Sequence, residues 1–225
     1  MWLLLLCLSL PAASTEPPTP PSTLQRVAKA IGDQARAFVA WLYSDESRGS
    51  INKVKGRDPF LQPYPDACAV GTPPELSWRP FPSASDGCAE VTLRNRRADR
   101  THTLACPPGR QGRFTLKPPA LEPGRWDLQV RSSEGERKSI SFVVGPLGPM
   151  DASPCDPQDN GPAVACPSEL SAEEQVLCEA LMLTLQRRFW EVEALLTDAP
   201  AGSDAANLRD QLRVRYRRTA LGAAQ

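Results

Sequence analysis

The chain has 225 residues, which suits one domain with appended segments or two small domains, since natural domains cluster at about 100 to 150 residues. Lysine plus arginine and aspartate plus glutamate both total 26, so no net charge favours nucleic acid, an anionic membrane surface or an acidic ligand. The 24 prolines gather between the predicted elements and mark their boundaries.

Residues 1–14 have the pattern of a cleaved secretory signal. The run from Trp2 to Leu10 is apolar, Pro11 ends it, and Ala12 to Ser14 supply the small residues that a signal peptidase requires. A run of this length is too short for a membrane-spanning helix, which takes about 20 residues, and no later segment is long enough. We therefore expect an exported protein, periplasmic or secreted, with no transmembrane span.

Residues 15–23 read TEPPTPPST and predict an extended, proline-rich spacer. Residues 24–44 follow with a helical pattern, and Ser22 or Thr23 is available as the N-cap. Apolar residues recur there at helical spacing: Leu24, Val27, Ala28, Ile31, Ala35, Phe38, Val39 and Leu42. The stripe predicts one amphipathic helix of about five turns that covers the core of its own protein.

Between Pro74 and Val144 the apolar period changes from the helical to the alternating one. The alternating segments are ELSWR, AEVTLR, RFTLK, RWDLQVR and SISFVV, with THTLAC as a weaker strand and Ser50 to Lys55 as a further candidate. Short strands with turn signals and no helical crossovers predict an antiparallel β-sandwich over residues 50–145. The expected fold class is α+β, with helices before and after the sandwich.

Two segments carry a resemblance to a known family. Residues 74–93 resemble the B and C strands of a fibronectin type III-like (Ig-like) domain, with Trp78 at the core tryptophan position. Residues 114–130 resemble its E strand, the leucine before its Pro-Gly turn, and its F strand. With the apolar alternation, this indicates a structural core of Trp78, Leu121, Trp126 and Phe142.

Trp126 stands where that family usually has a corner tyrosine. The resemblance therefore implies that the hydroxyl hydrogen bond of the corner is absent and that packing holds it. Similar domains follow the FecR-type regions of bacterial cell-envelope proteins, and residues 56–65, GRDPFLQPYP, are similar to the segment that precedes those domains.

Without the signal, six cysteines remain, and an even number in an exported chain predicts disulfides: Cys68, Cys88, Cys106, Cys155, Cys166 and Cys178. We expect Cys155 to pair with Cys166 and staple the Pro- and Gly-rich loop of residues 146–168. Cys88 has two open partners, Cys106 across a hairpin or Cys68, and the Cys106 pairing would set Val91 opposite Thr103. No C-x-x-C pair exists and His102 is the single histidine, which argues against a metal site.

Ser171 to Glu174 form a capping box, which predicts a helix through Leu196, and a second helix follows from Asp204 to Arg218. Together they predict an αα-hairpin over residues 169–220. The apolar face of the first helix is wider than one helix-helix seam requires. We expect this surplus to pack on the sandwich, or to contact a partner through Leu181, Phe189 and Trp190.

No motif for a nucleophile elbow, a phosphate loop or a dinucleotide site occurs, and His102 has no identifiable nucleophile beside it. Asp156 to Gly161 matches a calcium loop only in part and is interpreted as a turn, and the arginines of the last helix as a solvated face. We expect a non-enzymatic binding or scaffold protein with a protein partner, no cofactor and no nucleic acid. The alternatives are an accessory subunit of an envelope or secretion complex, an enzyme inhibitor, or an enzyme with an unrecognised site.

Overall fold

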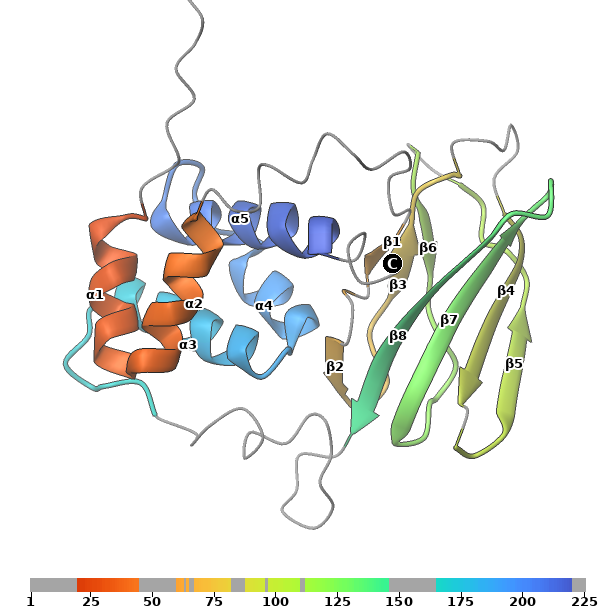
Figure 1. The fold of residues 1–225 in the computed structure, drawn as a ribbon, viewed down its shortest axis with the longest axis horizontal. Coiled ribbons are helices and arrows are strands. Elements are labelled where there is room, and N and C mark those ends of the chain that lie inside the picture. The colour runs from red at the N-terminus through yellow and green to blue at the C-terminus, as the bar shows by residue number, and fades with distance from the viewer. Residues whose placement is uncertain are drawn as a thin grey trace, which may run out of the picture.

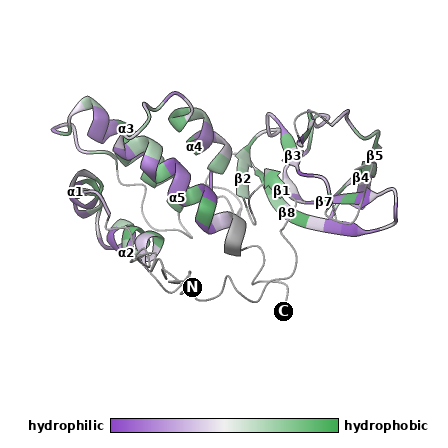
Figure 2. Ribbon diagram, turned by 90° about the horizontal axis from the view of Figure 1, so that it is seen from above, coloured by the Kyte–Doolittle hydropathy of each residue, from purple (hydrophilic) through white to green (hydrophobic). Residues whose placement is uncertain are grey.

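The computed structural model describes residues 20–44, 60–62, 64, 67–81, 88–95, 97–109, 112–145 and 165–219. Helices occupy one end of the molecule and strands the other, so the fold class is α+β (Figure 1, and from above in Figure 2). The predicted signal, the spacer up to Thr19, the candidate strand at Ser50 to Lys55, and the loop with Cys155 and the calcium-like turn lie outside the described residues.

Five helices and eight strands are described. The helices are α1 (Ser22–Ile31), α2 (Asp33–Tyr43), α3 (Ala172–Leu185), α4 (Phe189–Leu196) and α5 (Asp204–Thr219). The strands are β1 (Phe60–Gln62), β2 (Ala67–Val70), β3 (Leu76–Trp78), β4 (Cys88–Asn95), β5 (Arg100–Leu104), β6 (Phe114–Leu116), β7 (Gly124–Ser132) and β8 (Arg137–Gly145).

The strands form two sheets, one of three strands in the order β1-β3-β6 and one of five in the order β2-β8-β7-β4-β5. Every pair is antiparallel except β2 with β8, which run parallel from Ala67 opposite Phe142 to Val70 opposite Gly145. The prediction of a purely antiparallel sandwich is therefore wrong at this edge. The burial of the apolar run ACAV does not alternate, because Ala67 and Ala69 lie in the cluster between the sheets and Cys68 is buried against Val143.

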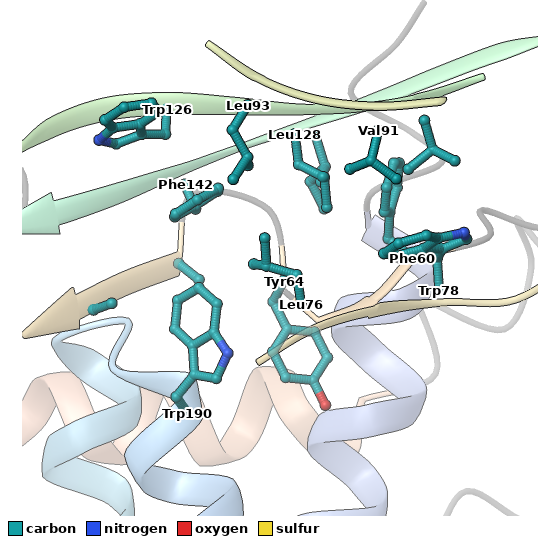
Figure 3. Packing of buried hydrophobic residues seen from close by; sticks show 14 of the residues in the cluster. Phe60, Tyr64, Leu76, Trp78, Val91, Leu93, Trp126, Leu128, Phe142 and Trp190 are labelled. Atoms are coloured by element: carbon teal, nitrogen blue, oxygen red, sulfur yellow. The ribbon is translucent and has the colours of Figure 1, made fainter. Parts of the chain in front are cut away.

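One hydrophobic cluster fills the space between the two sheets (Figure 3). The four residues predicted to form the structural core all lie in it: Trp78, Leu121, Trp126 and Phe142. The ring of Trp78 stacks on Phe114 at 5.7 Å between centroids. The alternating pattern thus places the inward side chains on the correct face, since a slip of one residue would have turned each of them outward.

The corner before β7 is not held by packing alone, contrary to the expectation from the sequence. The indole Nε1 of Trp126 donates to the backbone oxygen of Glu122 at 2.9 Å. This bond reaches back four residues, as a tyrosine hydroxyl does at the equivalent corner of other sandwiches. The indole N–H of Trp126, which is 1% exposed, therefore helps to hold this corner.

The predicted N-terminal helix is two helices, because Gly32 interrupts it with φ of 130°. A Cβ at this position would meet nothing within 4 Å, so the backbone conformation and not the available space requires glycine. Neither Ser22 nor Thr23 caps the start, since Pro21 is the N-cap and no side-chain cap bond forms. The apolar stripe continues across the break and both helices bury it in one core.

The predicted first C-terminal helix is also divided, into α3 and α4, at Gln186 to Arg188. Arg187 adopts φ of 59°, and its backbone oxygen accepts a hydrogen bond from Cys68 N of β2 at 2.8 Å. The break therefore turns a backbone acceptor towards the outer edge of the five-stranded sheet. An uncovered edge strand invites pairing with other chains, and the helical part protects this one.

The N-terminal and C-terminal helices share a second hydrophobic cluster, which the sequence had assigned to separate elements. Tyr43 of α2 donates to Asn207 of α5 at 3.2 Å, and burial raises the pKa of its hydroxyl well above the usual value, with Asp204 adding to the rise. The two ends of the chain thus form one helical unit, and the sandwich lies between them in sequence.

Two disulfides are described, Cys88–Cys106 and Cys166–Cys178. The expected Cys155–Cys166 pair is wrong, because Cys166 bonds to α3 instead. Of the two partners considered for Cys88, Cys106 is the correct one. Val91 nevertheless pairs with Leu104 and not Thr103, because β5 ends at Leu104 and the chain leaves the ladder before Cys106. Cys68 is also disulfide-bonded.

Candidate functional site

A pocket of about 350 Å³ lies where the helical unit meets the sandwich. One face of α4 forms its helical wall, since the lining residues recur at positions one turn apart. The opposite wall comes from β1, the segment before β3 and the segment before β6. The lining residues are Leu61, Tyr64, Pro74, Glu75, Arg113, Trp190, Glu193, Ala194, Thr197 and Arg213.

Two hydrogen bonds cross between the walls of this junction pocket. The hydroxyl of Tyr64 donates to Oε1 of Glu193 at 2.7 Å, and Nε1 of Trp190 donates to the backbone oxygen of Glu75 at 2.9 Å. Figure 3 shows Tyr64 and Trp190 below the sandwich core, between the strands and the helices. These bonds hold the two walls at a fixed separation, so the pocket is preformed.

The helical wall carries a bidentate ion pair. Arg213 Nε lies 2.9 Å from Oε1 and 3.1 Å from Oε2 of Glu193, whose side chain is 14% exposed. The hydrogen bonds to Glu193, then its charge, raise the pKa of Arg213. A guanidinium that forms a fork with a carboxylate is well fixed in orientation. The ion pair therefore has a defined orientation at the pocket wall.

The sandwich wall carries a second ion pair, which is more exposed. Arg113 Nη2 lies 2.5 Å from Oε1 of Glu75 and 3.0 Å from the hydroxyl of Ser77. The side chains of Arg113 and Glu75 are 45% and 38% exposed. This pair forms the rim of the pocket, where a ligand reaches its polar atoms without entering the core.

The charged side chains of the pocket form two ion pairs. Two carboxylates and two guanidiniums line the pocket, and each carboxylate is already neutralised by its own arginine. Among the described lining residues, no serine, threonine or cysteine lies beside a histidine as a nucleophile-base pair would. In the same part of the chain, no cluster of histidine, cysteine and carboxylate side chains could hold a metal ion.

The three predicted partner-binding residues are not on the surface. Phe189 and Trp190 are 2% and 6% exposed and belong to the sandwich core, and Leu181 is fully buried in the helical core. Trp190 packs edge-on against Phe142 at 5.8 Å. The surplus apolar face of the hairpin thus packs on its own sandwich, the first of the two expectations. Phe189 and Trp190 thus attach α4 to the sandwich, and Trp190 also lines the pocket.

Glu75, Arg113, Glu193 and Arg213 were not predicted as site residues. Glu193 and Arg213 come from the neighbouring helices α4 and α5, and Glu75 and Arg113 from the segments directly before the paired strands β3 and β6. Only tertiary structure brings each pair together. Charged residues are common on exposed faces, so the local spacing of these four residues does not distinguish them as site residues.

Two other predicted features have structural roles. His102 stacks on Trp126 at 5.6 Å between ring centroids, on the edge strand β5. Arg209 and Arg215 of the basic helix donate to the terminal backbone oxygens of α4 and α2, at Leu196 and Leu42 respectively. These arginines cap helix C-termini and are not the solvated face that the sequence predicts. None of the described helices is both long and apolar enough to cross a bilayer.

No known protein family matches the sequence, and no curated protein does either. Two solved structures show a partial likeness. The first is CopC from Methylosinus trichosporium OB3b, at 16% identity and a TM-score of 0.32, covering 43% of this chain and 98% of that one. The second is the ZIG-8–RIG-5 IG1–IG1 heterodimer, at 8% identity and a TM-score of 0.26, covering 47% of this chain and 100% of that one. TM-scores this low establish no shared function.

Proposed function

We propose that this chain is an exported, non-enzymatic binding protein that acts through a protein partner and receives part of that partner in the junction pocket. The observation that carries the proposal is the pocket itself, which is concave, preformed and lined by fixed charged groups. Pockets of this kind are the usual place for a bound group. The disulfides support export, because such bonds persist in oxidising compartments.

In this proposal the sandwich is a fibronectin type III-like scaffold. Three features support the assignment. The strand that resembles B pairs with the one that resembles E, in the three-stranded sheet. The strands that resemble C and F pair in the other sheet. The corner tryptophan makes the backbone bond that the family's tyrosine makes. The proposal also includes a relationship to the sandwich domains of FecR-type envelope proteins. Only the sequence resemblance of residues 56–65 supports this part.

The test compares partners captured by two matched variants. The tagged protein is crosslinked in the exported fraction of its source organism, as wild type, Arg113→Glu and Arg100→Glu. Arg113 pairs with Glu75 at the pocket rim, whereas Arg100 pairs with Glu122 at 2.6 Å on another part of the sandwich. We expect the same partner with wild type and Arg100→Glu, and its loss with Arg113→Glu. Equal recovery with all three proteins would show that the pocket is not the binding site.

A further inference from the structure

We infer that the junction pocket binds a neutral, hydroxyl-rich group, namely one or two sugar rings. This inference rests on the proposed binding function. The relevant feature is that the pocket presents four charged groups with no net charge between them.

The charge balance disfavours ionic ligands. An anion approaching Arg113 or Arg213 also approaches Glu75 or Glu193, because each arginine lies within 3 Å of its carboxylate partner. A cation meets the opposite conflict. To bind an ion tightly the pocket would have to break one of these pairs, which leaves the other charged member of that pair without its partner. A neutral ligand leaves both ion pairs intact.

The rim retains both donors and acceptors for such a ligand. Within the described part of the chain, the hydrogen bonds of Arg113 come from Nη2 alone, so the N–H groups of Nε and Nη1 remain. In the same part, Glu75 accepts through Oε1, so Oε2 remains. The Thr197 hydroxyl donates to the backbone oxygen of Glu193 and can still accept. Adjacent fixed donors and acceptors match neighbouring hydroxyls, each of which donates and accepts.

Apolar side chains complete the lining. Leu61, Pro74, Ala194 and Trp190 also line the pocket. A sugar ring has apolar C–H faces as well as hydroxyls, so it needs this mixture of surfaces. A purely apolar ligand would bury the rim charges without satisfying them.

The size and shape favour a compact ligand over an extended peptide. The volume of about 350 Å³ is near the lower end of the range for small-molecule sites, about 300 to 1,000 Å³. One common way for an extended peptide to bind is to pair its backbone with a strand edge. In this pocket the available donors and acceptors belong to side chains, and the hydroxyls of a compact ligand can reach them.

The direct test titrates the protein with defined probes and follows ligand-observed saturation-transfer NMR. The neutral probes are glucose, galactose, N-acetylglucosamine and its disaccharide, and the matched charged probes are glucuronate and glucosamine. A neutral tripeptide with blocked ends represents the peptide alternative. The proteins are wild type, Arg113→Gln, Glu75→Gln and the control Arg100→Gln, with unchanged circular dichroism required of each.

We expect at least one neutral saccharide to bind wild type and Arg100→Gln alike, and to bind Arg113→Gln and Glu75→Gln more weakly by at least about tenfold. The inference is wrong if a charged sugar or the tripeptide binds better than every neutral sugar, if binding is unchanged in both rim variants, or if no neutral saccharide binds at about 10 mM, where even a weak site would be occupied.

A second experiment, on the captured partner, identifies the source of the sugar. If the bound group is a glycan on that partner, enzymatic removal of its glycans and an excess of the free saccharide both release it. If the ligand is a free saccharide, deglycosylation leaves the partner bound, whereas an excess of the free saccharide still competes for the pocket and releases it. Should Arg113→Glu lose the partner while no neutral saccharide binds, the inference fails and the proposed protein-binding function stands.

Discussion

Arg26 of α1 contacts Glu174 of α3 at 2.7 Å, across 148 positions of the sequence. Glu174 is also the last residue of the capping box, where it accepts from Ser171 N at 2.9 Å. The hydrogen bonds with Ser171, followed by Arg26, lower the pKa of this carboxyl. The start of the third helix is therefore tied to the first helix, and N-terminal and C-terminal helices contribute to one helical unit.

A chain that ends at Pro149 should consequently lose more than a binding element. Without α3 to α5, the buried stripe of α1 and α2 and the ring of Phe142 become exposed. We expect the truncated protein to aggregate, since exposed apolar patches of this size promote association. Size-exclusion chromatography with light scattering measures this. A folded monomer would show that the helical unit is not needed to cover the cores.

The sequence predicts the strands from Leu76 onwards and the capping box at Ser171 well, because alternation and capping are local signals. It misses the break at Gly32, since the apolar stripe keeps its helical phase through the glycine. It also misses the break at Arg187, because the backbone oxygen exposed there bonds to Cys68 on a strand that is distant in the sequence. The sequence also does not predict the pairing of Glu193 with Arg213, because this pairing depends on how α4 and α5 pack.

The two core tryptophans should respond differently to the same substitution. Trp126 donates to Glu122, whereas the indole N–H of Trp78 is buried with no hydrogen-bond partner among the described residues. Tryptophan to phenylalanine removes similar volume at both sites, but only Trp126→Phe breaks a bond and leaves an acceptor unpaired. We expect Trp126→Phe to lower the free energy of unfolding by about 1 to 2 kcal/mol more than Trp78→Phe does. Urea denaturation measures both, and equal losses would contradict the role of the corner bond.

Arg215 should contribute much more to stability than the surface arginine Arg36. Arg215 is 5% exposed, donates to the backbone oxygens of Leu42 and Ser44, and lies over the ring of Trp41 at 5.6 Å. Arg215→Met leaves these carbonyls without that donor, and we expect a loss of about 1 to 3 kcal/mol. Arg36→Met removes only an exposed ion pair and should cost less than about 1 kcal/mol. Thermal unfolding followed by circular dichroism compares them, and similar losses would refute the capping role.

The disulfide pairing is open to a direct chemical check. Proteolysis without reductant, followed by mass spectrometry, should link the peptides that contain Cys88 and Cys106, and those that contain Cys166 and Cys178. Cys166→Ser should destabilise the protein by about 3 kcal/mol, the value for a loop of similar length. A peptide linking Cys155 to Cys166 would contradict the observed arrangement.

The protein should lose stability at alkaline pH through Tyr216. Burial raises the pKa of its hydroxyl from 10.0 to about 12, which outweighs the lowering by Arg187. In the unfolded chain the hydroxyl ionises near its ordinary value, while in the folded protein it stays protonated. The folded state then holds more protons, so this contribution to stability is complete below about pH 10 and disappears as the pH rises towards about 12.

The expected loss over this window is about 2 kcal/mol from Tyr216, in addition to a contribution of the same sign from Tyr43. Urea midpoints measured at intervals from neutral to alkaline pH give the size of the loss, and phenolate absorbance reports ionisation in the folded and the unfolded protein. Tyr216→Phe is the control, because it removes the ionising hydroxyl and keeps the ring that packs on Phe189 at 4.3 Å. A variant whose stability falls as steeply with pH as that of wild type would show that Tyr216 is not the titrating group.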